Sequence, residues 1–127
     1  MTESEWIQKF SNATNARILR THFDLQEKIK SHYKMRAEGK NLEKAIMYCE
    51  RQIALAPLTM RVMHENHYDG IEDGNKIRRE NGYPEIDIPF FSPSHYGYKQ
   101  YAIILKKRKE FDKLAELLAK KESEGWA

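Results

Sequence analysis

Apolar residues recur at helical spacing through most of the chain, and the clearest example is its last third. Two consecutive stretches there share the offsets 0, 3, 4 and 7. The two sets are Tyr98, Tyr101, Ala102 and Leu105, followed by Phe111, Leu114, Ala115 and Leu118. Each set makes one apolar stripe on a helix. Because only a short basic turn separates the stripes, residues 94–127 are predicted to fold as an antiparallel helical hairpin.

The N-terminal part predicts a short helix followed by a first hairpin. Thr2 and Glu5 have the spacing of a capping box, so residues 1–14 are expected to form a small helix that covers one end of the domain. Residues 15–57 predict the hairpin. Its first helix carries the stripe Ile18, His22, Leu25, Ile29 and Tyr33, and Gly39 is expected in the left-handed position between the helices. Its second helix carries the stripe Leu42, Ala45, Ile46, Cys49 and Ile53 and is expected to end at Pro57.

The middle of the chain, residues 58–93, predicts a degenerate hairpin and a long loop. One helix is expected from Leu58 to about Tyr68, and a shorter one from Asp73 to Asn81. Gly82, Pro84 and Pro89 then favour a loop from Gly82 to Ser92. Ser92 is expected to cap the last hairpin, with Pro93 in its first turn. The apolar loop residues Tyr83, Ile86, Phe90 and Phe91 either pack down in place of a missing helix or present a patch to a partner.

The two hairpins resemble the tetratricopeptide repeat. The matching residues are Gly39, Leu42, Ala45, Cys49 and Pro57 in the first, and Tyr98, Tyr101, Ala102, Leu105, Phe111 and Leu118 in the last. Leu114 replaces the usual small residue and Lys109 the usual turn glycine. Leu42 and Phe111 are 69 positions apart, about twice the repeat period of this class, so a third unit is expected between the hairpins. Phe23, like the aromatic residues of the hairpin stripes, is expected in the core.

The resemblance implies an all-α fold, in which antiparallel hairpins stack as a short right-handed solenoid and their first helices line a binding groove. It also implies a non-catalytic protein-protein interaction module. Carried onto this chain, the groove residues would be Lys30, Tyr33, Lys34, Arg36, Tyr96, Lys99, Gln100, Ile103 and Lys106. A mostly basic groove suits an acidic or amphipathic segment of a protein partner.

Composition indicates one soluble domain of 127 residues, with 32% charged and 40% apolar residues. No apolar run is long enough to span a bilayer, so no membrane association is expected. A single cysteine, Cys49, cannot form an internal disulfide and fits the reducing cytoplasm.

The net charge of +3 is distributed unevenly. Residues 57–93 hold four Lys/Arg against seven Asp/Glu, whereas both flanking parts have an excess of Lys/Arg. This asymmetry favours either self-association, with the middle of one copy against an end of another, or simply solvated helix faces of mixed charge. The ends of a short solenoid also need cover, which the N-terminal helix or a homodimer would supply.

No catalytic motif is present, and no cofactor or metal is expected. His64 and His67 are three residues apart but lack the further ligands that a zinc site needs. Cys49 occupies a core stripe, where a thiol is usually inert. The leading hypothesis is therefore an adaptor or inhibitor that binds a protein segment. An alternative is a small nucleic-acid-binding accessory protein that uses the basic turn Lys106 to Lys109, although the slight overall basicity makes nucleic acid the less favoured partner.

Overall fold

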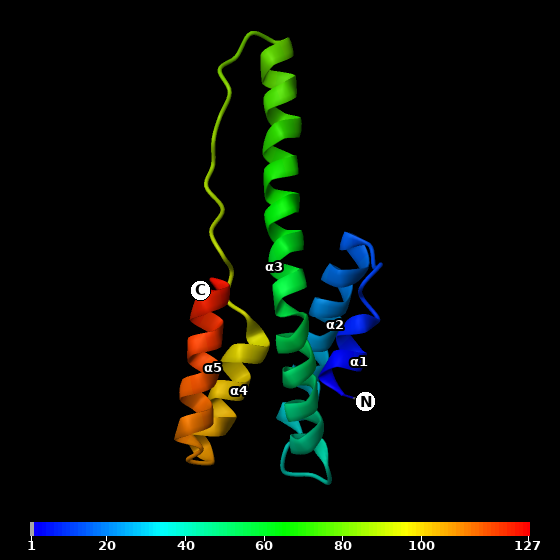
Figure 1. The fold of residues 1–127 in the computed structure, drawn as a ribbon, viewed down its shortest axis with the longest axis vertical. Coiled ribbons are helices and arrows are strands. Elements are labelled where there is room, and N and C mark those ends of the chain that lie inside the picture. The colour runs from blue at the N-terminus through cyan, green and yellow to red at the C-terminus, as the bar shows by residue number, and fades with distance from the viewer. Residues whose placement is uncertain (1) are drawn as a thin grey trace.

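The protein is all-α. A computed structural model describes residues 2–127, and within that range it contains five helices and no strand (Figure 1). The helices are α1 (Glu3–Gln8), α2 (Asn15–Lys34), α3 (Asn41–Glu80), α4 (Tyr96–Lys107) and α5 (Phe111–Glu124). The predicted fold class is thus confirmed at the level of a packed helical bundle.

Helix α1 lies against α3, at about the middle of the bundle (Figure 1). It begins where predicted, because the Thr2 side chain accepts a hydrogen bond from the Glu5 backbone N–H at 3.1 Å. The indole N–H of Trp6 donates to the carbonyl of Arg51 at 3.2 Å, and Phe10 is buried beside it. The short helix therefore covers part of the first hairpin, as its apolar residues predict.

Helices α2 and α3 form the first hairpin. The apolar stripe of α2 is buried against α3, and its members are Ile18, His22, Leu25 and Ile29. Gly39 in the connecting turn has φ +54, a left-handed conformation that costs glycine little. The small residues Ala45 and Cys49 on the facing side of α3 are fully buried.

Helix α3 runs for 40 residues without interruption, so the predicted stop at Pro57 is wrong. The break expected between Tyr68 and Asp73 is absent too, and the middle of the chain is not a hairpin. Pro57 is exposed, whereas a buried stripe crosses it at helical spacing through Ile53, Ala56, Thr59 and Val62. Burial of this stripe offsets the hydrogen bond that proline cannot donate. The boundary predicted at 57/58 between the first hairpin and the degenerate one consequently falls inside one helix.

The second hairpin, α4 and α5, packs directly on the first, with no third unit between them. Helix α4 contacts α2 and α3, and α5 covers the far side of α4. The approach of α4 to α3 is closest at Gly97, where a Cβ atom would lie 2.7 Å from the Gln52 side-chain oxygen and 3.3 Å from the Cys49 carbonyl oxygen. Glycine is therefore required at this crossing.

The cap of α4 differs from the prediction. His95, not Ser92, is the N-cap, and its ring nitrogen Nδ1 accepts a hydrogen bond from the Tyr98 N–H at 3.2 Å. At the other end of the hairpin, Gly125 closes α5 with φ +85, and Trp126 folds back into the core.

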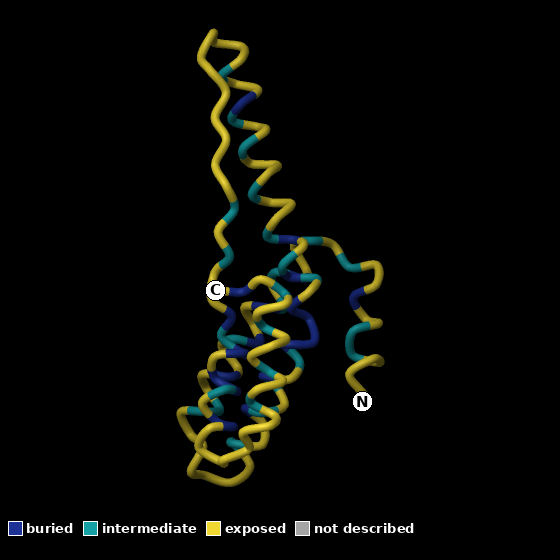
Figure 2. The backbone as a smooth tube through the Cα atoms, turned by 60° about the vertical axis from the view of Figure 1, so that its left-hand side comes forward, coloured by how far each residue is buried: buried dark blue, intermediate teal, exposed yellow. Residues whose placement is uncertain are grey.

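The outer part of α3 leaves the bundle as an arm (Figures 1 and 2). The bundle ends near Glu65, whose carboxylate accepts a hydrogen bond from the Asn15 side chain at the start of α2. Beyond this point, residues 66–80 of α3 project alone. Residues 81–93, here called the strap, return in extended form along the projecting helix (Figure 1). We define the arm as residues 66–91, which comprise the projecting part of α3 (66–80) and residues 81–91 of the strap.

Burial confirms part of the predicted core. Tyr98 and Tyr101 are buried, but Phe23, Phe111 and Leu118 are 47%, 58% and 44% exposed, so the prediction that these three are core residues is wrong. Helix α5 is the last layer of the stack and has no fully buried residue. Its residues Leu114 and Leu117 pack against the core formed with α3 and α4, whereas Phe111 and Leu118 face away from it.

Candidate functional site: a basic face on helices α2 and α4

The residues predicted to line a groove come from two helices that lie side by side. The Lys30 ammonium is 5.2 Å from the centre of the Tyr96 ring, and the Lys107 ammonium donates to the Tyr33 hydroxyl at 3.2 Å. Each pair joins α2 to α4. The structure thus brings together two sets of residues that are about 65 positions apart in the sequence.

On α2, the remaining predicted residues lie near its C-terminal end. Arg36 follows the helix in the turn, where its guanidinium stacks 4.4 Å from the Tyr33 ring centre and donates to the Tyr33 carbonyl at 3.1 Å. Lys34 is exposed. Lys30 also pairs with Glu27 at 3.6 Å, but both side chains are open to water, so this ion pair holds Lys30 only weakly.

On α4, the predicted residues divide between the interior and an outer ridge. Gln100 is 6% exposed and lies beneath Tyr96, so it supports the surface and does not belong to it. Lys99, Ile103 and Lys106 are exposed and follow one another at offsets 0, 4 and 7, which places them on one side of the helix. Ile103 is thereby flanked by two free cations.

We call this surface the basic platform. Its residues are Lys30, Tyr33, Lys34, Arg36, Tyr96, Lys99, Ile103, Lys106 and Lys107. Lys107 was predicted only as part of the basic turn. Its place opposite Tyr33 depends on how the two hairpins pack, which no local pattern reveals.

The platform carries side chains that can bind a charged segment. Several lysine and arginine head groups stand around two tyrosine rings and one exposed isoleucine. Such groups form charge-assisted hydrogen bonds with carboxylates, and the rings supply flat apolar contact area.

The predicted basic turn forms part of a larger basic end of the molecule. Residues Lys106 to Lys109 are exposed in the α4–α5 turn. The α2–α3 turn, with Arg36 and Lys40, lies at the same end of the bundle (Figure 1). Seven Lys/Arg, namely Lys34, Arg36, Lys40, Lys106, Lys107, Arg108 and Lys109, are therefore carried by this end.

Cys49 is buried in the core, and the two spaced histidines contact the strap. Cys49 is fully buried, and burial together with the neighbouring Glu50 charge raises the pKa of its thiol to about 12. His64 and His67 lie beneath the strap: the Phe90 ring is 4.0 Å from the His64 ring, between centres, and His67 Nε2 is 2.7 Å from the Ile88 carbonyl oxygen. Among residues 2–127, no group of three or more His, Cys, Asp or Glu is arranged to hold a metal ion.

A buried polar cluster joins α2, α3 and α4. The Gln52 amide donates to the His22 carbonyl at 2.9 Å, and the His22 and His95 ring centres are 5.2 Å apart with Trp126 against both. Burial lowers the pKa of His22 to about 4; burial, and then the neighbouring His22, lower that of His95 to about 3. Both rings are therefore neutral at pH 7. Sequence reasoning placed His22 on a buried stripe but did not single out Gln52, a polar residue among apolar stripe positions.

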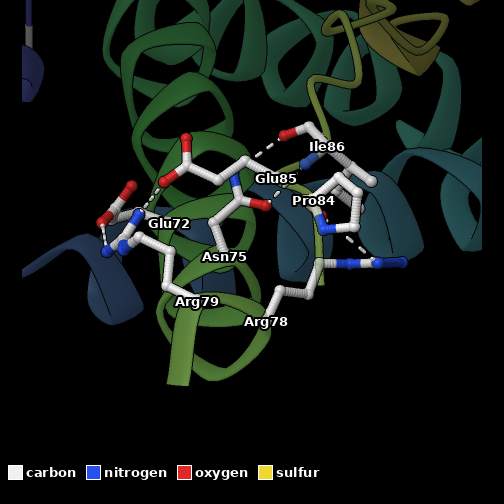
Figure 3. Close-up of polar contacts among 7 residues, drawn as sticks. All are labelled: Glu72, Asn75, Arg78, Arg79, Pro84, Glu85 and Ile86. Carbon is white, nitrogen blue, oxygen red and sulfur yellow. Dashed lines mark hydrogen bonds and ion pairs between the residues drawn. The ribbon is translucent and has the colours of Figure 1, made fainter. Parts of the chain in front are cut away.

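The strap is held to α3 by polar side chains (Figure 3). Asn75 donates to the Ile86 carbonyl and accepts from the Ile86 N–H, both at 2.8 Å. Arg79 binds Glu85 of the strap and also Glu72 of the helix. Asn75 is only 6% exposed, so this two-way contact is sheltered from water and fixes the register of the strap.

The predicted loop contacts behave differently from one another. Phe90 packs down against the helix, as one of the two open alternatives predicts. Tyr83 and Phe91, in contrast, are 63% and 81% exposed, and Ile86 is exposed despite its backbone contacts. The strap therefore both packs on α3 and leaves an apolar surface.

Comparison of the chain with protein-family models, with curated proteins and with solved structures gave no match. Within residues 2–127, no helix is both long and apolar enough to cross a membrane.

Proposed function

We propose that this chain is a non-catalytic protein-protein interaction module, an adaptor or an inhibitor, whose basic platform binds an acidic or amphipathic segment of a partner protein. The observation that carries the proposal is the pairing of Lys30 with Tyr96 and of Lys107 with Tyr33. These contacts gather cations from two distant parts of the chain on one exposed surface, and tyrosines fix their positions.

The proposal includes a repeat-like arrangement of the helices. In this arrangement, α2–α3 and α4–α5 are two tetratricopeptide-like units of a right-handed solenoid, and α2 and α4 are the inner helices. The buried small residues Ala45 and Cys49 on α3 and the close approach at Gly97 support it, because small residues let neighbouring helices of such units approach closely. The arm then replaces the third unit that the 69-residue spacing predicted.

Binding would depend on several moderate contacts and not on one strong pair. Exposed ion pairs contribute about 0–1 kcal/mol each, so even four of them supply at most about 4 kcal/mol, which corresponds to millimolar binding, and tighter binding needs apolar contacts as well. Ile103 and the tyrosine rings add apolar contact area between those charges. Such an interface should weaken as salt is added. Within this proposal the module works in the cytosol, which the single buried thiol of Cys49 supports.

Affinity capture from the native cell extract, followed by quantitative mass spectrometry, tests the proposal. The variant Lys30→Glu/Lys99→Glu reverses two platform charges on different helices, and Lys9→Glu/Lys44→Glu reverses two exposed charges away from it. The platform variant is expected to lose captured proteins that the wild type and the control variant retain, with unchanged helical circular dichroism. If the platform variant captures the same proteins, the platform is not the binding surface.

A second candidate function is nucleic-acid binding by the basic end. The observation that favours it is that the α2–α3 and α4–α5 turns lie at the same end of the bundle (Figure 1). Together this end carries seven Lys/Arg side chains. Phosphate contacts of this kind release counterions, so binding would fall steeply with salt. A gel-shift titration with double- and single-stranded DNA and RNA at low salt tests it. Absence of a shift at micromolar protein would exclude this function.

A further inference from the structure

The arm combines exposed apolar residues with an excess of negative charge. It is 26 residues long, yet it holds six of the twelve large hydrophobic residues that are exposed in residues 2–127, namely Tyr68, Ile77, Tyr83, Ile86, Ile88 and Phe91. It contains three Lys/Arg and six Asp/Glu, whereas the rest of the chain contains 19 and 13. A surface of this kind, projecting from the bundle, indicates a binding partner of positive charge.

The face of the projecting helix opposite the strap has a regular pattern. The strap is bound by His67, Asn75 and Arg78, which share one side of α3. Asp73, Ile77 and Glu80 lie roughly half a turn away from that side. Their side chains are exposed, that of Ile77 at 62%. This free face therefore presents an isoleucine between two carboxylates.

The basic platform carries the complementary pattern. Asp73, Ile77 and Glu80 stand at offsets 0, 4 and 7, and Lys99, Ile103 and Lys106 on α4 stand at the same offsets. When two such helices lie side by side in the same direction, lysine meets aspartate, isoleucine meets isoleucine, and lysine meets glutamate. The offsets 0, 4 and 7 place the three residues of each helix on one side, so the isoleucine pair would lie between the two lysine–carboxylate pairs.

The direction of the helices allows this pairing between two copies. Within one chain α3 runs towards the tip of the arm and α4 runs the opposite way (Figure 1). A two-fold axis perpendicular to the bundle inverts the second copy, so that its α4 runs in the same direction as the arm of the first. The 15 projecting residues of α3 are about 22 Å long and the 12 residues of α4 about 18 Å, so their lengths match.

We infer that a second copy of this chain is the occupant of the platform: two copies pack antiparallel, with the arm of each on α4 of the other. The resulting interface is isologous, because each copy contributes one arm and one platform. This pairing rests on the proposed function, since the arm is then one acidic, amphipathic segment that the platform binds. An external partner would have to displace the arm.

Charge exchange between two variants tests the pairing. Asp73→Lys/Glu80→Lys reverses two charges of the arm, and Lys99→Glu/Lys106→Glu reverses two charges of the platform. The side chains of these four residues are exposed and lie outside the side-chain hydrogen bonds described for residues 2–127. Multi-angle light scattering at low salt should give twice 15.1 kDa for the wild type and 15.1 kDa for each variant alone. An equimolar mixture of the variants should recover the double mass, because both contacts then join opposite charges. Lys9→Glu/Lys44→Glu should dimerise as the wild type does.

The outcomes separate this inference from the proposed function. Any of three results would overturn the arm-to-platform dimer. The wild type could stay at 15.1 kDa at high concentration, both variants could remain dimeric, or the mixture could stay monomeric. The arm-reversed variant keeps an intact platform, so it still captures an acidic partner if the proposed function is right. A wild type that is monomeric but still captures an acidic partner would refute only the dimer, whereas unchanged capture by the platform-reversed variant would refute the proposed function.

Discussion

Replacing Gly97 by alanine tests the contact on which the direct packing of the two hairpins depends. A Cβ atom at this position would lie 2.7 Å from Gln52 Oε1, 3.1 Å from the His95 ring and 3.3 Å from the Cys49 carbonyl oxygen. The Gln52 side chain is fully buried, and its amide is held by the His22 carbonyl at 2.9 Å, so it cannot swing aside freely. The added methyl group must therefore push α4 away from α3.

Two effects of opposite sign decide the size of the change. Alanine gains up to about 1 kcal/mol over glycine from helix propensity. Overpacking a close helix crossing costs about 1–3 kcal/mol, and disturbing the buried amide hydrogen bond costs about 1–2 kcal/mol more. The free energy of unfolding of Gly97→Ala should therefore fall by about 1–5 kcal/mol.

Urea denaturation followed by far-ultraviolet circular dichroism measures this change. Gly70→Ala is the matched control, because a Cβ atom at Gly70 meets nothing within 4 Å and only the propensity gain of up to about 1 kcal/mol remains. The control should be as stable as the wild type or more so. An unchanged or raised midpoint for Gly97→Ala would show that α4 does not approach α3 as described.

Four further predictions concern other parts of the fold. Pro57→Ala should raise the free energy of unfolding by about 1–3 kcal/mol in the same assay, because an exposed proline inside α3 withholds a helix hydrogen bond; a loss of stability would mean that the chain needs a break there. Since the pKa values of His22 and His95 are lowered to about 4 and about 3, the unfolded chain binds protons first as the pH falls. The free energy of unfolding should be constant above about pH 6.5 and then decrease towards pH 4, by up to about 1.4 kcal/mol per pH unit for each histidine. Urea titrations from pH 8 to 4 would measure this slope, which His22→Gln should reduce. Asn75→Ala removes both hydrogen bonds of the Ile86 backbone, so hydrogen exchange in the strap should accelerate by about 5–30-fold with unchanged helicity; equal exchange rates would contradict the clamp. Because the pKa of the Cys49 thiol is raised to about 12, an aromatic disulfide reagent should react with it only in denaturant, and fast labelling of the folded protein would argue against a buried position.

The sequence pattern was sufficient for the helices of the bundle because their stripes are local. Spacing placed Ile18, His22 and Ile29 on one buried side of α2, and Tyr98 and Tyr101 on a buried side of α4. The turn at Gly39 also followed from local backbone preference. These features need only the period of a helix and the conformational freedom of glycine, and both can be read from neighbouring residues.

The arm could not be predicted in this way, because proline was given more weight than periodicity. Pro57 interrupts only one hydrogen bond, and the apolar spacing of Ala56, Thr59 and Val62 continues across it. That continuity was the available signal for a long helix. Proline costs about 3 kcal/mol in a helix interior, but burial of several side chains on both sides of it outweighs that cost.

The basic platform was predicted in composition but not in geometry. Lys30 and Lys99 were assigned to one surface, and the structure places their helices side by side. Gln100 was assigned there too and is buried instead, while Lys107 was missed. Such differences of one helical step depend on how α4 is rotated against α2, and that rotation is set by the long-range contacts at Gly97 and Tyr96.

The central claim is that α2 and α4 share one basic face, and nuclear Overhauser spectroscopy tests it most directly. The ε-methylene protons of Lys30 should show cross-peaks to the Tyr96 ring, and those of Lys107 to the Tyr33 ring, since each ammonium lies within 6 Å of the ring centre. Cross-peaks from Tyr96 and Lys107 to residues 66–80 of α3, with none to α2, would contradict the claim.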